Sequence, residues 1–336
     1  MRKPVAGTFG TVSDTCSTLC FILAIAASVS LASTARAASC CGGGSATSLI
    51  LPKFSSAMVD ASIDYEHYDG FWNGDGDWTA DPQGSSLNQY RLNLAYAHRL
   101  NPNWQTSISL PYVWNQNQYA KLKRNTSAIG DTTLSLWYEA FDKIACVWDV
   151  KTWQDLLPAV YLGTSLTVPT GVSPYDDVTD NFDITGRGFY RLDASLLIDK
   201  TIYPWTLSFA ASYGKYLERP VNREYGSYVE PYRKQPGDRL NTTVSFGYTY
   251  FTDEMESLTA TLAYAYLKES EATINGDTDT TSGFRKESIA TTLAWATDDR
   301  DWIIKLSWSH APSRNDWGRN FPTTDIFSTG ISHVFR

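Results

Sequence analysis

Alternation of apolar and polar residues over residues 89–114 is the feature that most limits what this chain can fold into. Every second residue from Tyr90 to Tyr96 is apolar, and the pattern resumes from Trp104 to Trp114. A period of two predicts extended strands with one apolar face and one polar face. Strands of soluble sheets average about five or six residues, whereas these are longer and begin and end their apolar face with an aromatic residue. Both properties are typical of strands that cross a lipid bilayer in a β-barrel.

The same alternation recurs along the rest of the chain and predicts about twelve strands. Their expected ranges are 57–65, 90–96, 104–114, 129–141, 160–168, 190–198, 205–213, 240–250, 258–266, 289–295, 302–308 and 327–335. The connections between them alternate long and short, as in bacterial outer-membrane barrels. We therefore predict an all-β fold, a transmembrane antiparallel β-barrel of about 12 strands with short periplasmic turns and long extracellular loops. Both termini would be periplasmic, and Pro111 should cause a bulge because it cannot donate a ladder hydrogen bond.

The N-terminus carries the features of an export signal. An apolar run over residues 19–31 follows Arg2 and Lys3 and precedes Ala35-Arg36-Ala37. This arrangement predicts a signal peptide over 1–37 and a location in the cell outer membrane of a Gram-negative bacterium. Residues 38–54 are expected to form a Cys/Gly/Ser-rich periplasmic lead-in that is mobile over 38–51, and 55–336 the outer-membrane β-barrel. Lipidation of Cys40 is the alternative to ordinary cleavage, although no Leu stands three positions before it.

Charge and composition limit the partners of the mature chain. Removal of the signal peptide takes away three basic residues and one acidic residue, so the formal net charge falls from −8 to −10. An acidic exported protein is a poor candidate for binding nucleic acid. The expected partners are the lipid bilayer, the barrel-assembly machinery that recognises a C-terminal aromatic such as Phe335, and small solutes. We expect no cofactor.

Charged residues on the polar faces of the predicted strands indicate a water-accessible lumen. These lumen charges are Asp60, Asp64, Glu66, Arg91, Arg191, Asp193, Arg239 and Lys305. One interpretation is a constriction that sorts solutes by charge. The other is a network of salt bridges that fills and stiffens the bore. Small residues dominate the inner faces of the strands expected between 205 and 266, which favours a passage over a plug.

Aromatic residues also occur in the predicted extracellular loops. They are Trp72, Trp78, Tyr175 and Trp317. Aromatic side chains offer apolar contact and stacking to a passing ring. We therefore expect these four residues to make the first contacts with a solute.

One predicted periplasmic turn, residues 142–157, is unusually long. Its apolar residues recur at roughly helical intervals, which predicts either a short helix at the membrane–water boundary or an irregular turn. Cys146 lies in this turn, on the same side of the membrane as Cys40 and Cys41. A disulfide between Cys146 and one of the two, a soft-metal site formed by all three thiols, and three unpaired thiols are the open alternatives.

The histidines give little reason to expect an enzyme. His67, His98, His310 and His333 all lie near the ends of predicted strands. An outer-membrane phospholipase would need a His–Ser pair on the lipid-facing side. His310 is adjacent to Ser309, and neighbours along a strand face opposite sides. The sequence therefore predicts no catalytic site.

Three short motifs resemble a known family. They are Ser109-Leu110-Pro111-Tyr112, Ile129-Gly130-Asp131-Thr132-Thr133-Leu134 and Leu166-Thr167-Val168-Pro169-Thr170-Gly171. In order and spacing they are similar to the MetA-pathway phenol-degradation family of outer-membrane β-barrel proteins, over most of the chain after residue 55. The resemblance implies an outer-membrane barrel associated with the passage of aromatic or other hydrophobic compounds.

The sequence thus predicts a porin-like outer-membrane channel for passive uptake of small hydrophobic or aromatic solutes. The first alternative is a barrel without transport that serves as an adhesin or a structural scaffold. The second alternative is an interfacial lipase.

Overall fold

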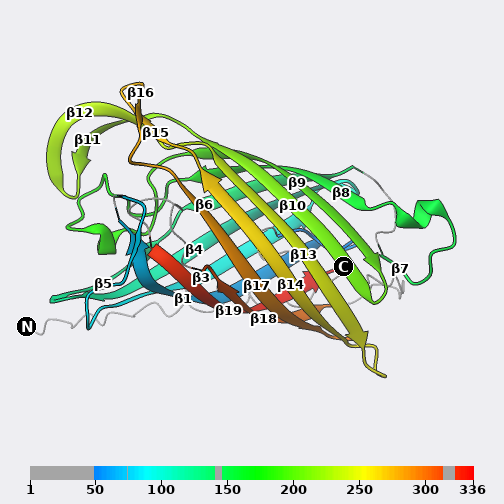
Figure 1. Ribbon diagram of the computed structural model, residues 1–336. Helices are drawn as coiled ribbons and strands as arrows, with labels where there is room; N and C mark the ends of the chain where they lie inside the picture. The colour runs from blue at the N-terminus through cyan, green and yellow to red at the C-terminus, as the bar shows by residue number, and fades with distance from the viewer. Residues whose placement is uncertain (1–48, 74, 141–145, 313–321) are drawn as a thin grey trace, which may run out of the picture. The chain divides into compact units, whose positions relative to one another are not determined.

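The computed structural model describes residues 49–73, 75–140, 146–312 and 322–336, and twelve of its strands form a closed antiparallel barrel (Figure 1). Each barrel strand pairs with the next one along the chain, and the last pairs with the first, from Ala57↔Phe335 onwards. The barrel strands are β1 (Ala57–Trp72), β3 (Ser86–Arg99), β4 (Trp104–Tyr119), β6 (Thr132–Glu139), β8 (Ala159–Val168), β9 (Arg191–Ile202), β10 (Trp205–Tyr216), β13 (Arg239–Phe251), β14 (Ser257–Glu269), β17 (Phe284–Ala296), β18 (Trp302–His310) and β19 (Pro322–Phe335). The predicted fold class is confirmed.

The alternating pattern places apolar side chains on the outside of the barrel. Val244 of β13 and Leu262 of β14 are 46% and 55% exposed, although both lie in the middle of their strands. Their neighbours along the chain, Thr243 and Ala263, face the bore, because successive residues of a strand face opposite sides. An apolar outer wall and a bore lined by small and polar side chains follow directly from the period of two.

The connections differ in length at the two ends of the barrel. We call the end with residues 100–103, 203–204, 252–256 and 297–301 the short-turn end. The opposite end, with connections 73–85, 169–190, 217–238 and 270–283, is the long-loop end, and Figure 1 shows the two groups well apart. The even number of strands and this alternation agree with the sequence-based prediction.

The long connection between β6 and β8 contains little regular structure. Its described part holds β7 (Cys146–Val147), which pairs in parallel with β9, and a single 3₁₀ turn, η1 (Trp153–Leu156). Trp148 packs against Tyr203 with the two rings tilted and their centroids 4.1 Å apart, so the connection covers part of the short-turn end. In the described ranges, no helix is long and apolar enough to span a membrane.

The long-loop end carries strands that the sequence pattern did not predict. β11 (Arg219–Glu224), β12 (Ser227–Gln235), β15 (Ala272–Ile274) and β16 (Asp277–Asp279) form a second, four-stranded sheet. We expected residues 218–238 and 268–284 to be loops, and that expectation is wrong. Two further strands extend barrel strands: β2 (Trp78–Thr79) pairs with β1, and β5 (Leu122–Ile129) pairs with β4.

The bulge expected at Pro111 lies in the neighbouring strand. β4 pairs with β3 without interruption, with Pro111 opposite Asn93. On its other side β4 pairs with β6 up to Ser109↔Thr133 and with β5 from Tyr112↔Ile129, so one extra residue lies between the two ladders on the partner side. Pro111 accepts a hydrogen bond from Gly130 N at 2.8 Å but has no N–H to return. The interruption therefore falls opposite the proline.

Candidate functional site

The inner faces of the barrel strands enclose a cavity of about 500 Å³. It extends across the whole bore, since strands from opposite walls line it. Its lining is mostly small or polar and includes Ser62, Asn93, Ser107, Ser135, Ser165, Ser195, Ala210, Ser212, Asn241 and Thr243, with Leu49, Trp137 and Leu196 as the large apolar members. Small side chains on β10 and β13 leave this room, as their sequences predicted.

Seven of the eight predicted lumen charges line this cavity, and Glu66 lies beside them. Six of the eight form ion pairs. Lys305 Nζ lies 3.6 Å from Asp60 Oδ2, Arg91 Nη2 lies 3.6 Å from Glu66 Oε2, and Arg191 Nε lies 2.9 Å from Asp193 Oδ1. For these six residues the contacts favour a salt-bridge network that stiffens the wall.

The two remaining lumen charges lie on well-separated strands. Asp64 of β1 accepts a hydrogen bond from Asn93 Nδ2 at 2.7 Å and forms no ion pair with any described residue. Arg239 of β13 forms neither an ion pair nor a side-chain hydrogen bond within the described ranges. Five strand-to-strand steps separate β13 from β1 around the ring of twelve, so these two charges lie on nearly opposite walls of the bore.

A third arginine, which the strand pattern did not identify, lies close to Arg191 and Arg239. Arg187 Nη1 lies 2.6 Å from Glu269 Oε2 and donates to Tyr216 Oη at 2.6 Å. Burial acts to lower the pKa of Arg187, but the nearby Glu269 and Tyr216 outweigh it and raise that pKa above its ordinary value. Arg191 donates to the same Tyr216 oxygen at 3.2 Å. Arg187 lies in a loop, where no periodicity could indicate its direction.

The connection between β8 and β9 folds against the inner side of the barrel wall. It contains η2 (Asn181–Asp183). Asn115 of β4, which is 3% exposed, donates from Nδ2 to the carbonyl oxygens of Phe182 and Ile184, both at 3.0 Å. Thr126 of β5 donates to the Phe182 oxygen at 2.9 Å. We call residues 169–190 the inward loop. It narrows the bore near the long-loop end.

Asp131 fastens the inward loop at both of its ends. Its carboxylate accepts hydrogen bonds from Gly171 N at 3.1 Å and from Arg187 N at 2.8 Å. Gly186 passes so close that a Cβ there would lie 2.2 Å from Asp131 Oδ1, so only glycine fits without displacing the carboxylate. Thr170 donates to the Gly130 oxygen at 2.7 Å and adds to the attachment. Two of the motifs that carry the family resemblance therefore meet here.

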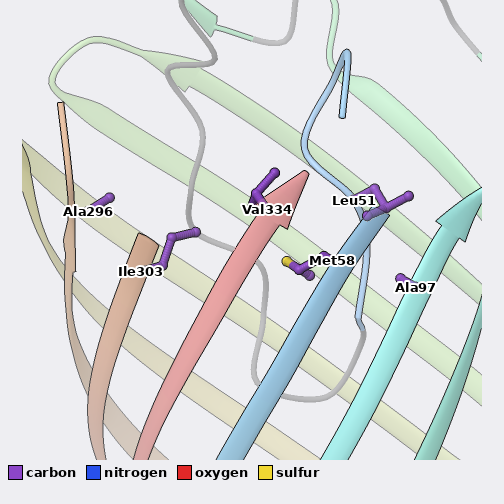
Figure 2. Close-up of a cluster of buried hydrophobic side chains, with 6 residues drawn as sticks. All are labelled: Leu51, Met58, Ala97, Ala296, Ile303 and Val334. Atoms are coloured by element: carbon purple, nitrogen blue, oxygen red, sulfur yellow. The ribbon is translucent and has the colours of Figure 1, made fainter. Parts of the chain in front are cut away.

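The short-turn end of the bore is closed by the segment that precedes β1. Leu51 is 2% exposed and packs with apolar inner-face residues of several strands. Figure 2 shows this cluster at the strand ends: Leu51, Met58, Ala97, Ala296, Ile303 and Val334. Leu51 N also donates to Gln105 Oε1 at 2.6 Å, and Leu49 lines the cavity. We call residues 49–52 the stopper.

The described part of the predicted lead-in, residues 49–54, is bonded to side chains of the barrel wall. Arg99 donates to the carbonyl oxygens of Pro52 at 3.0 Å and Ser55 at 2.8 Å. Lys53 Nζ lies 3.3 Å from the buried Glu139 Oε1. The apolar inner faces at this end of the barrel offer burial that the Gly/Ser-rich composition did not predict. Residues 38–48 and the predicted signal peptide 1–37 lie outside the described residues.

The aromatic residues expected to make the first contacts with a solute occupy different environments. Trp72 is the last residue of β1 and is fully buried, so the prediction that it lies accessible in a loop is wrong. Trp78 lies in β2 and is partly exposed. Tyr175 packs edge-on against Phe189, with ring centroids 5.3 Å apart, and burial raises its pKa to about 12. Trp317 lies outside the described residues.

The cysteines and histidines form no metal-binding group in the described ranges. The backbone of Cys146 pairs with Thr201, while its side chain, Cys40 and Cys41 lie outside what the structure describes. No group of three or more His, Cys, Asp or Glu side chains could hold a metal ion in that part of the chain. His310 Nδ1 lies 2.9 Å from Asp325 Oδ1. The three possible states of the three thiols remain hypotheses.

Comparison with known proteins identifies the architecture. No family model and no curated protein matches the sequence. The COG4313 outer membrane channel from Pseudomonas putida F1 has a similar structure, with a TM-score of 0.63 and 14% identity over 86% of this chain and 97% of that chain. The beta domain of the Bordetella autotransporter BrkA gives a TM-score of 0.49 and 8% identity over 83% of this chain and 100% of that chain. The first of these likenesses shows the fold: this chain is a β-barrel of the outer-membrane type.

Proposed function

We propose that the protein is an outer-membrane channel for passive uptake of small hydrophobic or aromatic solutes. The single observation that carries the proposal is the cavity of about 500 Å³ inside the barrel, whose lining combines small side chains with fixed charges. A scaffold or adhesin has no need of an internal cavity. A barrel that serves as a scaffold could fill its bore with large side chains.

The outer wall supports the membrane location. Exposed apolar side chains such as Val244 and Leu262 stand in the middle of the strands, where hydrocarbon would contact them. With the usual orientation of such barrels, the short-turn end and both termini face the periplasm. The long-loop end, with the four-stranded sheet, would then face outward.

The closures at the two ends indicate a gated passage. The inward loop and the stopper are attached to the wall mainly by hydrogen bonds to a few side chains, and neither is a strand of the barrel. Either segment can therefore move while the strand ladders stay intact. A solute would pass the inward loop, occupy the cavity and leave past Leu51.

The similar channel supports a channel role, and the family resemblance supports the solute class. The Pseudomonas putida protein is an outer membrane channel by its description. The motifs around Pro111, Asp131 and Pro169 resemble those of a family associated with passage of aromatic compounds. In this chain the motifs around Asp131 and Pro169 fasten the inward loop, which the proposal requires to move.

The test is transport by the purified protein in liposomes, with benzyl alcohol and phenol as solutes. We expect entry into liposomes with the barrel to exceed entry into empty ones. Leu51→Ala should increase that flux, because it removes most of the buried side chain of the stopper. Leu156→Ala is the matched control, since Leu156 lies in the same half of the molecule but is 53% exposed. A barrel that passes neither solute, in wild type and in Leu51→Ala, would refute the channel.

A further inference from the structure

One wall of the bore carries more positive than negative charge. Arg187, Arg191 and Arg239 lie there with two carboxylates, Asp193 and Glu269. Each carboxylate is bonded to one arginine, Asp193 to Arg191 at 2.9 Å and Glu269 to Arg187 at 2.6 Å. One positive charge is left without a counter-charge from the described residues, and Arg239 carries it.

The register of the strands would have given Arg239 a partner. Arg239 stands directly opposite Glu269 in the pairing of β13 with β14. The Glu269 carboxylate is instead bonded to Arg187, a residue of the inward loop and not of a barrel strand. On its other side Arg239 is paired with Gly214, which has no side chain to offer. A Cβ at Gly214 would lie 2.2 Å from Asp193 Oδ1, so this position also leaves room for the Asp193 carboxylate.

The neighbouring cations are fixed in place around Arg239. The Tyr216 hydroxyl, whose side chain is 1% exposed, accepts hydrogen bonds from both Arg187 and Arg191. Arg187, Arg191 and Lys286 all act on Arg239 as like charges, and Glu269 acts on it in the opposite sense. Because Arg187 and Arg191 are held by these bonds, they cannot move away to relieve the repulsion. An anion that enters the cavity can relieve this repulsion by supplying a negative charge.

The surroundings favour an organic anion over a small inorganic one. Arg191 and Arg239 line the cavity together with Ala210, whose side chain faces the bore. A guanidinium can donate two parallel hydrogen bonds to one carboxylate, which fixes the orientation of the bound group. Ala210, which faces the bore, would contact a ring or a short alkyl body attached to that carboxylate.

We infer that Arg239, assisted by Arg191, binds the carboxylate of a small organic acid in the bore, so that the channel takes aromatic carboxylates such as benzoate. The inference rests on the proposed channel and narrows its solute class. Neutral aromatic solutes would still pass, but without this contact. Asp64, the unpaired charge on the opposite wall, would repel a carboxylate that approached it and so directs the anion towards Arg239.

The test is block of single-channel current in planar bilayers by sodium benzoate, with sodium chloride as the carrier electrolyte. We expect benzoate to block the wild type and Arg239→Gln to weaken that block about tenfold, the effect of losing one charged hydrogen bond. Arg239→Lys keeps the charge without the two-pronged geometry and should fall between them. Asp64→Asn is the matched control: it removes the other unpaired charge and should leave the block equal or stronger.

Further solutes separate this inference from the proposed function. Benzylammonium should not block, and added inorganic phosphate should block less than benzoate at equal concentration. Equal block by benzoate in wild type and Arg239→Gln would overturn the inference. If Arg239→Gln does not fold, the wild type alone decides: the inference is overturned if benzoate fails to block it. Passage of benzyl alcohol without benzoate block leaves the channel standing and removes only the carboxylate site, whereas passage of neither refutes the channel itself.

Discussion

Removal of the Asp131 carboxylate should release the inward loop while the barrel stays folded. Asp131 accepts hydrogen bonds from the backbone N–H groups of Gly171 and Arg187, one near each end of the loop. Asp131→Ala removes both acceptors and leaves those two N–H groups to find water. The strand ladders of β4, β5 and β6 do not involve the Asp131 side chain, so the wall itself should persist.

The size of the effect follows from these two bonds. Hydrogen bonds to a charged group contribute about 1.5–3 kcal/mol each when well shielded from water. Asp131 is only half-buried and its bond to Arg187 N is exposed to solvent, so we take about 2 kcal/mol for the pair together. That free energy corresponds to an increase of about 30-fold in the ratio of open to closed loop.

Hydrogen exchange of the loop amides measures this ratio. Thr185 N and Gly186 N both donate to the Val172 oxygen at 2.9 Å, and we expect these bonds between the two ends of the loop to open when the ends are released from Asp131. Their exchange in detergent-solubilised protein should accelerate about 30-fold in Asp131→Ala. Asp177→Asn is the control, because it removes the same charge from a side chain that is 83% exposed. Unchanged exchange at Gly186 in Asp131→Ala, or equal acceleration in Asp177→Asn, would show that Asp131 does not hold the loop.

Two further predictions test the outer wall and the short-turn end. Val244→Arg, on the outer face, should lower the free energy of unfolding in liposomes by about 2–4 kcal/mol, whereas Thr243→Arg, on the inner face, should cost much less; equal costs would argue against a lipid-facing wall. Asp155 accepts hydrogen bonds from Lys151 N and from both Thr152 N and Thr152 Oγ1, and the two backbone bonds and the hydroxyl hold its pKa below the ordinary value. The stabilisation of η1 is therefore complete above the ordinary carboxyl pKa and is lost as the pH falls through the lowered one. As the pH falls through the lowered pKa, amide exchange of residues 151–157 in the wild type should rise relative to the intrinsic exchange rate of an unfolded chain. In Asp155→Asn this ratio should not change with pH.

The twelve barrel strands could be predicted because the surroundings impose their pattern. A residue that faces the outside must be apolar, as at Val244, and its neighbour that faces the bore can be small or polar, as at Thr243. The strands β11 and β12 have no such constraint. They lie beyond the barrel at the long-loop end, and the alternation of Arg219, Val221 and Arg223 is too short and too polar to separate a strand from a loop.

The site could be predicted only in part, since strand pattern gives the face of a residue but not its partner. The pattern assigned Asp60, Arg191 and Lys305 to the bore, and all three line the cavity. That Asp60 pairs with Lys305 depends on how β1 and β18 come together on either side of β19, which sequence distance does not reveal. Arg187 shows the limit most clearly. It changes the partner of Glu269 and leaves Arg239 unpaired, and it comes from a loop.

The inward loop and the stopper are attached to the wall by the same kind of bond. This explains both where they are attached and why the sequence did not predict the attachment. In each, a wall side chain bonds to the backbone of a segment: Asn115 and Asp131 to the inward loop, Gln105 and Arg99 to residues 51–55. A backbone carries its N–H and C=O groups whatever its sequence, so no motif in the moving segment is required. Each bond contributes only about 1 kcal/mol net, or somewhat more where a charge takes part. Either segment can therefore detach at a cost far below that of unfolding the barrel, because the continuous strand ladders of the wall are untouched by the change.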